Sequence, residues 1–275
     1  MMQRAQNIKN LNFEKNCMLD TNLEKVTNWS EEKQLLGKII LEILYDCGAI
    51  KTWYRDNPEG WILRSKLWSP VYISLRDISS KGNGALILGA IGKSLSKLII
   101  NEIPNFDKVL GLATTGIQIV TAITMCSNIP SLYTRKLEND NNFENFDLIL
   151  KKYGEHNLIE GEMKDNEIVV IVDDLVTKFK SVIFGRKQLY YEANKRNCNI
   201  TCDNAVVLID REQGAELVAR KENMNLHSLI KFKSNLHWLK DKLAPIEYQI
   251  LNDYFKDYSK FQNNNEIKDI ISLAK

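Results

Sequence analysis

The chain has 275 residues, of which 44% are hydrophobic and 26% are charged. This is enough apolar material for a substantial core, and the length fits one α/β domain with extensions better than two equal domains. Lys and Arg total 37 against 35 for Asp and Glu, a net charge of +2, so the composition does not point to a nucleic-acid partner.

The sequence does not suggest a membrane protein or a secreted protein. Residues 1–28 hold no hydrophobic segment of signal-peptide length, and the apolar run at 85–92 is interrupted by Lys93. The five cysteines lack tight CxxC pairs and a histidine array, so ordinary reduced thiols are expected rather than a zinc site. We expect a soluble, cytoplasmic protein.

The first half of the pattern predicts two helices and two short strands. Ser30 is the expected N-cap of the first helix, because Glu31 and Glu32 follow it and apolar residues then recur on one helical face. The expected elements are a helix from Ser30 to about Gly48, β-like runs at 60–65 and 71–76, and a helix over 86–100 that Pro104 prevents from continuing simply.

From residue 108 onward, strand-like and helix-like segments alternate. Strands are expected at 108–113, 131–133, 168–172 and 205–209, and helices at 117–127 and 181–196. Repeated β-then-α units imply an α/β protein whose mainly parallel central sheet is flanked by helices.

Polar pairs follow four of the expected strands. They are Thr114 and Thr115, Arg135 and Lys136, Asp173 and Asp174, and Asp210 and Arg211. Because the carboxyl ends of parallel strands meet at one edge of a sheet, we expect a common anionic-ligand site there. The two acids can hold ribose hydroxyls, while the loop amides and the following helix N-terminus take a phosphate.

A buried strand followed by two acids is not specific, since it also occurs in response regulators, kinases and metal-dependent phosphatases. Further pieces stand in a characteristic order: 60–65 with 69–72, 111–116, 135–136, 151–154 leading to 159–161, 168–181 and 210–214. Together they resemble the orotate phosphoribosyltransferases, a branch of the type I phosphoribosyltransferases, from about Gly60 to Leu229.

This resemblance implies a type I phosphoribosyltransferase fold with a small N-terminal hood subdomain. We expect a polar tail at 1–29, the phosphoribosyltransferase domain with its hood at 30–231, and a C-terminal extension at 232–275. The implied reaction moves phosphoribose from phosphoribosyl pyrophosphate (PRPP) to orotate, giving orotidine 5′-monophosphate and pyrophosphate. It also implies Mg²⁺, held mainly through PRPP rather than by direct protein ligands, and a homodimer.

The resemblance also assigns roles to residues. Asp173 and Asp174 are expected to bind the ribose hydroxyls, and Lys151 to act from a catalytic loop that in this family closes over the neighbouring subunit's site. The expected substrate-binding residues are Arg64, Tyr72 and Ile73 beside base and PRPP, Thr114, Thr115, Arg135 and Lys136 toward pyrophosphate, Tyr153 on the catalytic loop, Thr177, Lys178, Phe179, Lys180 and Ser181 around the 5′-phosphate, and Arg211 at the orotate carboxylate. From residue type alone, Tyr72 and Ile73 also fit the core, Arg64 the surface, and Arg211 an ion pair with Asp210.

The phosphate loop departs from the family pattern. Lys178, Phe179 and Lys180 stand where the family usually has glycines, which let backbone amides approach a phosphate. These residues either preserve the loop with added positive charge or remove PRPP binding. Two alternatives therefore stay open beside orotate transfer: a phosphoribosyltransferase for another base, and a noncatalytic nucleotide-sensing protein on the same fold.

Overall fold

A six-stranded sheet forms the centre of the computed structural model, which describes residues 28–63, 66–137 and 156–273. Its strand order is β10-β9-β8-β5-β6-β7, and all neighbouring pairs are parallel except β6 with β7. The strands are β5 Lys108–Gly111, β6 Ser131–Thr134, β7 Ile159–Glu160, β8 Glu167–Val176, β9 Ile200–Asp210 and β10 Asn225–Lys231. The expected α/β class with a mainly parallel sheet is confirmed.

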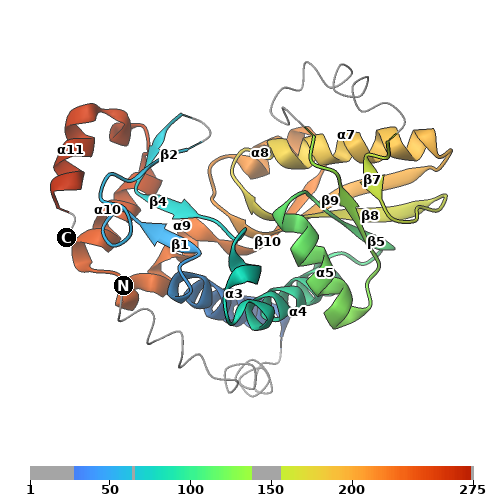
Figure 1. Cartoon of the computed structure of the whole chain (residues 1–275), viewed down its shortest axis with the longest axis horizontal. Helices are drawn as coiled ribbons and strands as arrows, with labels where there is room; N and C mark the ends of the chain where they lie inside the picture. Colours follow the sequence, from blue (N-terminus) through green and yellow to red (C-terminus); the bar gives the residue numbers. More distant parts are fainter. Residues whose placement is uncertain (1–27, 64–65, 138–155, 274–275) are drawn as a thin grey trace.

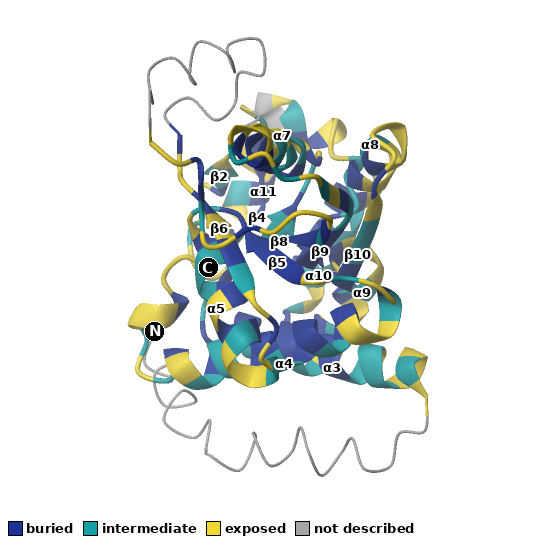
Figure 2. Cartoon of the chain, turned by 90° about the vertical axis from the view of Figure 1, so that its right-hand side faces the viewer, coloured by how far each residue is buried: buried dark blue, intermediate teal, exposed yellow. Residues whose placement is uncertain are grey.

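Helices cover both faces of the sheet (Figure 1). One face carries α3 Trp29–Asp46, α4 Gly84–Glu102 and α5 Thr115–Ser127, and the other carries α7 Lys180–Lys195 and α8 Ala215–Lys221. Figure 2 shows the buried strands between these two layers. Within β8, Val170 and Val172 join one hydrophobic cluster while Val169 and Ile171 join the other, as alternate side chains of a strand must. The continuous apolar run at 168–172 follows from this two-sided burial.

The first helices lie close to their expected positions. Helix α3 begins one residue before Ser30, and its N-cap is Asn28, whose Oδ1 accepts a hydrogen bond from the backbone N of Glu31 at 3.0 Å. The expectation of Ser30 as the cap was therefore wrong, because the Asn side chain satisfies the free helix N–H instead. By length and composition α4 resembles a membrane span, but 56% of its apolar window is buried inside the protein.

Four short strands, rather than two, make up the hood. The strand β1 Ile50–Thr52 pairs with β4 Val71–Ile73, and β2 Trp61–Ile62 pairs with β3 Trp68–Ser69, both antiparallel. The two runs expected from the sequence therefore belong to different pairs. A single turn of 3₁₀ helix, η1 Ile78–Ser80, then leads into α4.

The C-terminal segment packs on the hood, and Figure 1 shows α10 and α11 on the side of β1, β2 and β4. Its elements are α9 Phe232–Asn235, η3 Leu236–Lys242, α10 Pro245–Lys256, η4 Lys260–Gln262 and α11 Asn264–Ser272. The indole of Trp53 donates to the carbonyl of Ile270 at 3.1 Å, and the backbone N of Trp68 donates to Gln262 Oε1 at 2.8 Å. The hood and this segment share one hydrophobic cluster, while the division at residue 231 stays a prediction.

Candidate active site

A cavity of about 350 Å³ opens at the carboxyl edge of the sheet, under the hood. The hood strand β4 and the residues after it supply one wall, and the loop after β5 and the end of β8 with its following loop supply the others. The lining residues are Tyr72, Ile73, Ser74, Arg76, Ala113, Thr114, Thr115, Asp173, Asp174, Leu175, Thr177, Lys178, Phe179, Lys180 and Ser181. Eleven of the residues singled out from the sequence stand in this list, so segments more than 100 positions apart in the chain meet here.

The acid pair lies within β8 rather than after its end. Pairing with β9 continues to Val176, which lies opposite Asp210. Asp173 is buried; its Oδ1 accepts from the backbone N of Asp174 and its Oδ2 from Ser181 Oγ, both at 3.0 Å. Burial, and then the neighbouring charge of Asp174, raise the pKa of Asp173 well above its ordinary value. Burial also raises the pKa of Asp174, although the positive charge of Arg76 opposes this.

The phosphate loop, residues 177–181, turns sharply into α7. Phe179 has a φ of +63°, the left-handed conformation that glycine adopts most easily, and α7 begins at the next residue. The Phe179 side chain is 1% exposed and packs in the cluster on the α7 side of the sheet. The lysines on either side are exposed and line the cavity. Lys178 Nζ lies 6.0 Å from the centre of the Tyr258 ring, which belongs to the C-terminal segment.

The loop after β5 is held in close contact with the start of α5. A Cβ on Gly111 would lie 2.5 Å from the carbonyl oxygen of Gly116, so a side chain there would force the turn apart. The backbone N of Ala113 donates to Thr134 Oγ1 at 2.8 Å, which ties this loop to β6. Thr114 and Thr115 are thereby placed in the cavity wall.

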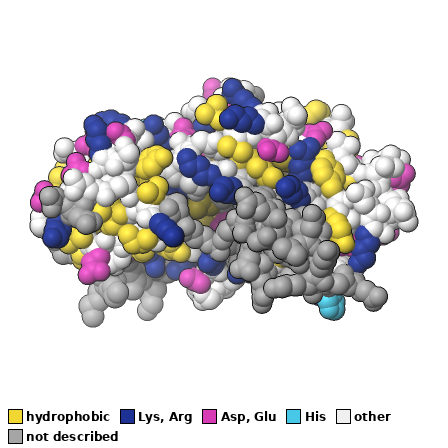
Figure 3. Space-filling model, turned by 90° about the horizontal axis from the view of Figure 1, so that it is seen from above, with side chains coloured by type: hydrophobic (Ala, Val, Ile, Leu, Met, Phe, Trp, Pro, Cys, Tyr) yellow, Lys and Arg dark blue, Asp and Glu magenta, His cyan; other side chains and the backbone are white. Residues whose placement is uncertain are grey.

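A smaller cavity of about 110 Å³ adjoins the first and shares Ala113, Asp173, Lys180 and Ser181 with it. Arg135 and Lys136 line this second cavity. Arg135 forms an ion pair with Glu160 at 2.8 Å, with both side chains partly exposed, and its carbonyl accepts from Gln188 Nε2 at 3.1 Å. Figure 3, which views the molecule from above, shows Lys and Arg side chains in several groups across that face.

Arg211 stands apart from the other candidates. It is 3% exposed and lines neither cavity. Its Nη2 lies 3.5 Å from Ser69 Oγ, and its Nε is buried without a hydrogen-bond partner. Desolvation lowers the pKa of the guanidinium. Among the described residues no ion pair joins it to Asp210, whose Oδ1 accepts from the backbone N of Glu212 at 2.8 Å.

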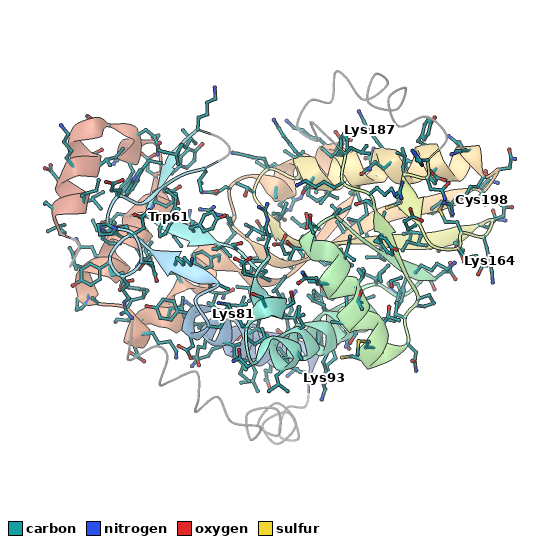
Figure 4. All side chains as sticks on the ribbon, in the orientation of Figure 1. Trp61, Lys81, Lys93, Lys164, Lys187 and Cys198 are labelled. Atoms are coloured by element: carbon teal, nitrogen blue, oxygen red, sulfur yellow. The ribbon has the colours of Figure 1, made fainter. Side chains whose placement is uncertain are left out.

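Some of the expected site residues cannot be placed in the structure, and some residues that line the larger cavity were not predicted from the sequence. Arg64, Lys151 and Tyr153 lie outside the described residues. The sequence reasoning missed Ser74 and Arg76, which follow β4 and line the larger cavity. Their signal was a polar residue and a cation at the end of an expected strand, the same signal that singled out the other pairs. Trp61 was also missed; its ring stacks on that of Tyr72 with centroids 5.8 Å apart, on the hood (Figure 4).

Comparison with known proteins finds similar sequences, although no protein-family model matches the chain. An orotate phosphoribosyltransferase of Methanocaldococcus jannaschii is 32% identical over 173 residues, covering 63% of this chain and 85% of that protein. The chain belongs to the orotate phosphoribosyltransferase family. The uridine 5′-monophosphate synthase of Bos taurus is 32% identical over 195 residues, 71% of this chain. The chain spans only 35% of the length of that synthase.

Solved structures of the family have the same fold. The UMP synthase of Leishmania donovani superposes with a TM-score of 0.63 at 20% identity, covering 80% of this chain and 42% of the other. The orotate phosphoribosyltransferase of Aeropyrum pernix gives a TM-score of 0.54 at 20% identity, covering 74% of this chain and 97% of the other. The type I phosphoribosyltransferase fold expected from the sequence is thus confirmed.

Proposed function

We propose that this protein is an orotate phosphoribosyltransferase, which transfers phosphoribose from PRPP to orotate. The observation that carries the proposal is the larger cavity, where two adjacent carboxylates face the loop that opens α7. Membership of the family supports orotate as the acceptor. In this reaction the bond from the ribose C1 to the pyrophosphate oxygen breaks, and a bond from C1 to N1 of orotate forms.

Different side chains of the two cavities bind different parts of PRPP. Asp173 and Asp174 accept hydrogen bonds from the ribose hydroxyls, and the loop at 177–181 surrounds the 5′-phosphate at the N-terminus of α7. Arg135 and Lys136 in the adjoining cavity face the pyrophosphate, where negative charge grows as the C1–O bond breaks. Orotate is already an anion, so correct placement of its N1 matters more than a strong base.

Mg²⁺ fits the donor atoms of this site. It prefers oxygen ligands and is commonly held by one or two carboxylates together with substrate phosphates. We propose that the ion is held mainly through PRPP, with Asp173 and Asp174 as the nearest carboxylates of the cavity. When bound there, the ion would supply positive charge that offsets the negative charge growing on pyrophosphate.

A homodimer is part of the proposal, because in this family the catalytic loop of one subunit closes over the site of the other. Lys151, the residue expected on that loop, belongs to the undescribed range 138–155. Light scattering on the purified protein measures the subunit number. A monomer that turns over orotate at full rate would refute the shared site.

The direct test incubates purified protein with orotate, PRPP and Mg²⁺ and follows the loss of orotate absorbance. We expect turnover that needs all three components and stops when EDTA removes the metal ion. Uracil and hypoxanthine in place of orotate test transfer to another base. If calorimetry shows PRPP binding but no base is turned over, the noncatalytic sensing function is favoured instead. The substituted phosphate loop is the reason for testing this alternative.

A further inference from the structure

Lys178 of the phosphate loop lies close to two segments that come later in the chain. Its ammonium nitrogen is 6.0 Å from the centre of the Tyr258 ring, a distance at which the face of an aromatic ring attracts a cation. A Cβ built on Gly214 would lie 3.7 Å from the same nitrogen, so the backbone before α8 also borders the ammonium group. The side chain of Lys178, which lines the larger cavity, therefore reaches the C-terminal segment.

The turn that carries Tyr258 is fixed by hydrogen bonds of its own. Asp257 Oδ1 accepts from the backbone N of Ser259 at 3.1 Å and from the Ser259 hydroxyl at 2.5 Å. Gln262 Nε2 donates to the carbonyl of Tyr258 at 2.9 Å. The Tyr258 side chain itself is at the surface, because 36% of the residue is exposed. Its ring can therefore be replaced without opening the core.

Gln262 also fastens this turn to the hood. Its Oε1 accepts from the backbone N of Trp68 at 2.8 Å, and its Nε2 donates to the carbonyl of Trp68 at 3.2 Å. The neighbouring Phe261 is 9% exposed, and its ring meets that of Tyr254 edge-on with centroids 5.6 Å apart. The hood strand β3 thus sets the position of Tyr258, and the C-terminal segment connects the hood to the phosphate loop.

A lysine needs such a contact more than the residue that it replaces. Where the family usually has glycines, backbone amides contact the phosphate, and the fold already holds them in place. The ammonium group of Lys178 lies at the end of a flexible side chain, which loses conformational entropy when it is held in one position. A ring that holds the ammonium before the ligand binds removes part of that cost. The C-terminal segment at 232–275, which lies beyond the family resemblance, supplies this ring.

We propose that Tyr258 is a positioning residue for Lys178. Its ring holds the ammonium group beside the site of the 5′-phosphate. The C-terminal segment then contributes to PRPP binding, although none of its described residues lines either cavity. This inference rests on the PRPP site of the proposed function, because it takes the loop at 177–181 as the place of the 5′-phosphate.

The test removes the aromatic face and measures PRPP binding directly. Tyr258→Leu deletes the face, whereas Tyr258→Phe keeps it and loses only the hydroxyl. In calorimetric titration with PRPP and Mg²⁺, we expect Tyr258→Leu to raise the Kd about threefold, the size of one cation–π contact at an exposed site. Tyr258→Phe should keep the wild-type Kd, and the KM for orotate should stay unchanged in both variants. Tyr191→Leu is the matched control, because it replaces a tyrosine of α7 that is 41% exposed and lines neither cavity.

A double-variant cycle decides whether the tyrosine acts through the lysine. In the Lys178→Ala background, Tyr258→Leu should cause no further loss of PRPP affinity, because the cation that the ring holds is absent. An equal loss in both backgrounds would mean that the leucine changes the turn in another way, and it would overturn the positioning role.

The outcomes separate this inference from the function on which it rests. Wild-type protein that does not bind PRPP rejects the proposed function and the positioning role with it. If wild type binds PRPP and Tyr258→Leu binds it equally well or more tightly, the positioning role alone is rejected. If Tyr258→Leu does not fold, Gln262→Met releases the turn by deleting its hydrogen bonds to Trp68. A rise in the Kd of this variant that disappears in the Lys178→Ala background supports the role, and an unchanged Kd overturns it.

Discussion

Asp173 accepts a hydrogen bond from the hydroxyl of Ser181 at 3.0 Å, which joins the end of β8 to the first turn of α7. The side chain that we assign to the ribose thus also fixes one end of the phosphate loop. Because one contact fixes both groups before PRPP binds, binding costs less conformational entropy.

Asp174→Asn tests the acid pair without breaking that contact. Asp174 lines the cavity, and the hydrogen bond from Ser181 goes to its neighbour. We expect PRPP-dependent turnover to fall roughly 10- to 100-fold, because a hydrogen bond from a hydroxyl to a carboxylate is worth more than one to an amide. Steady-state rates with orotate measure the loss, and circular dichroism with thermal melting checks the fold. Near-normal turnover in the folded variant would remove the pair from the site.

Asp173→Asn is expected to stabilise the protein at neutral pH. Burial raises the pKa of Asp173, so the folded state holds the proton more tightly than the unfolded chain. The stability from this group is complete below the pKa of the unfolded chain and is lost as the pH rises through the folded pKa. Asparagine does not ionise, so the melting temperature of the variant should gain on wild type as the pH rises above about 4, the ordinary pKa of aspartate. A constant or shrinking difference over that range would contradict the raised pKa.

The sequence predicted which residues meet at the larger cavity better than it predicted the bounds of the surrounding elements. The strand at 168–172 is recognisable because both faces of β8 are buried, which leaves an unbroken apolar run. Its continuation to Val176 was missed because Asp173 and Asp174 are polar, and only pairing with β9 keeps them in the strand. The strands β1, β3 and β7 have two or three residues each, too few for any periodicity to emerge.

The contacts of Arg211 could not be predicted from local sequence patterns. Its contact with Ser69 of β3 depends on how the hood folds over the sheet, and no spacing rule relates the two positions. Helix α10 itself carried a signal that went unused, because Pro245 opens it and Glu247 occupies its third position. Ser74 and Arg76 could likewise have been added from their place after an expected strand.

Arg211→Lys should separate the two substrates. Lysine keeps the charge but loses the planar fork that binds a carboxylate through two N–H groups. We expect the KM for orotate to rise at least tenfold and the KM for PRPP to change little. Initial rates with each substrate varied at saturation of the other measure both constants. Parallel changes, or none, would mean that Arg211 holds the fold together and does not recognise the base.

Phe179→Gly tests whether backbone strain or side-chain packing has the larger effect on stability at this position. Glycine at φ +63° would relieve about 1 kcal/mol of left-handed strain. It would also delete a side chain that is 1% exposed, a loss of about 3–5 kcal/mol for a buried phenylalanine. Packing should win, so we expect a net destabilisation of roughly 2–4 kcal/mol in urea unfolding. A variant as stable as wild type would show that the side chain contributes little to the core.

The last prediction concerns the lysines on either side of Phe179. Lys178 and Lys180 are exposed and line the cavity where the family usually has small residues. We expect at least one ammonium group to replace part of the backbone contact with the 5′-phosphate. Lys178→Ala/Lys180→Ala should then weaken PRPP binding about tenfold or more at low salt, and by less near 1 M salt, where charges are screened within about 3 Å.

Calorimetric titration with PRPP and Mg²⁺ at two ionic strengths measures this difference. Lys164→Ala/Lys221→Ala is the matched control, because it removes the same charge from exposed positions that line neither cavity. If the control loses as much affinity, the effect comes from the overall charge of the protein and not from the loop. Unchanged affinity of the loop variant at low salt would reject compensation by lysine, since electrostatic attraction is strongest under that condition.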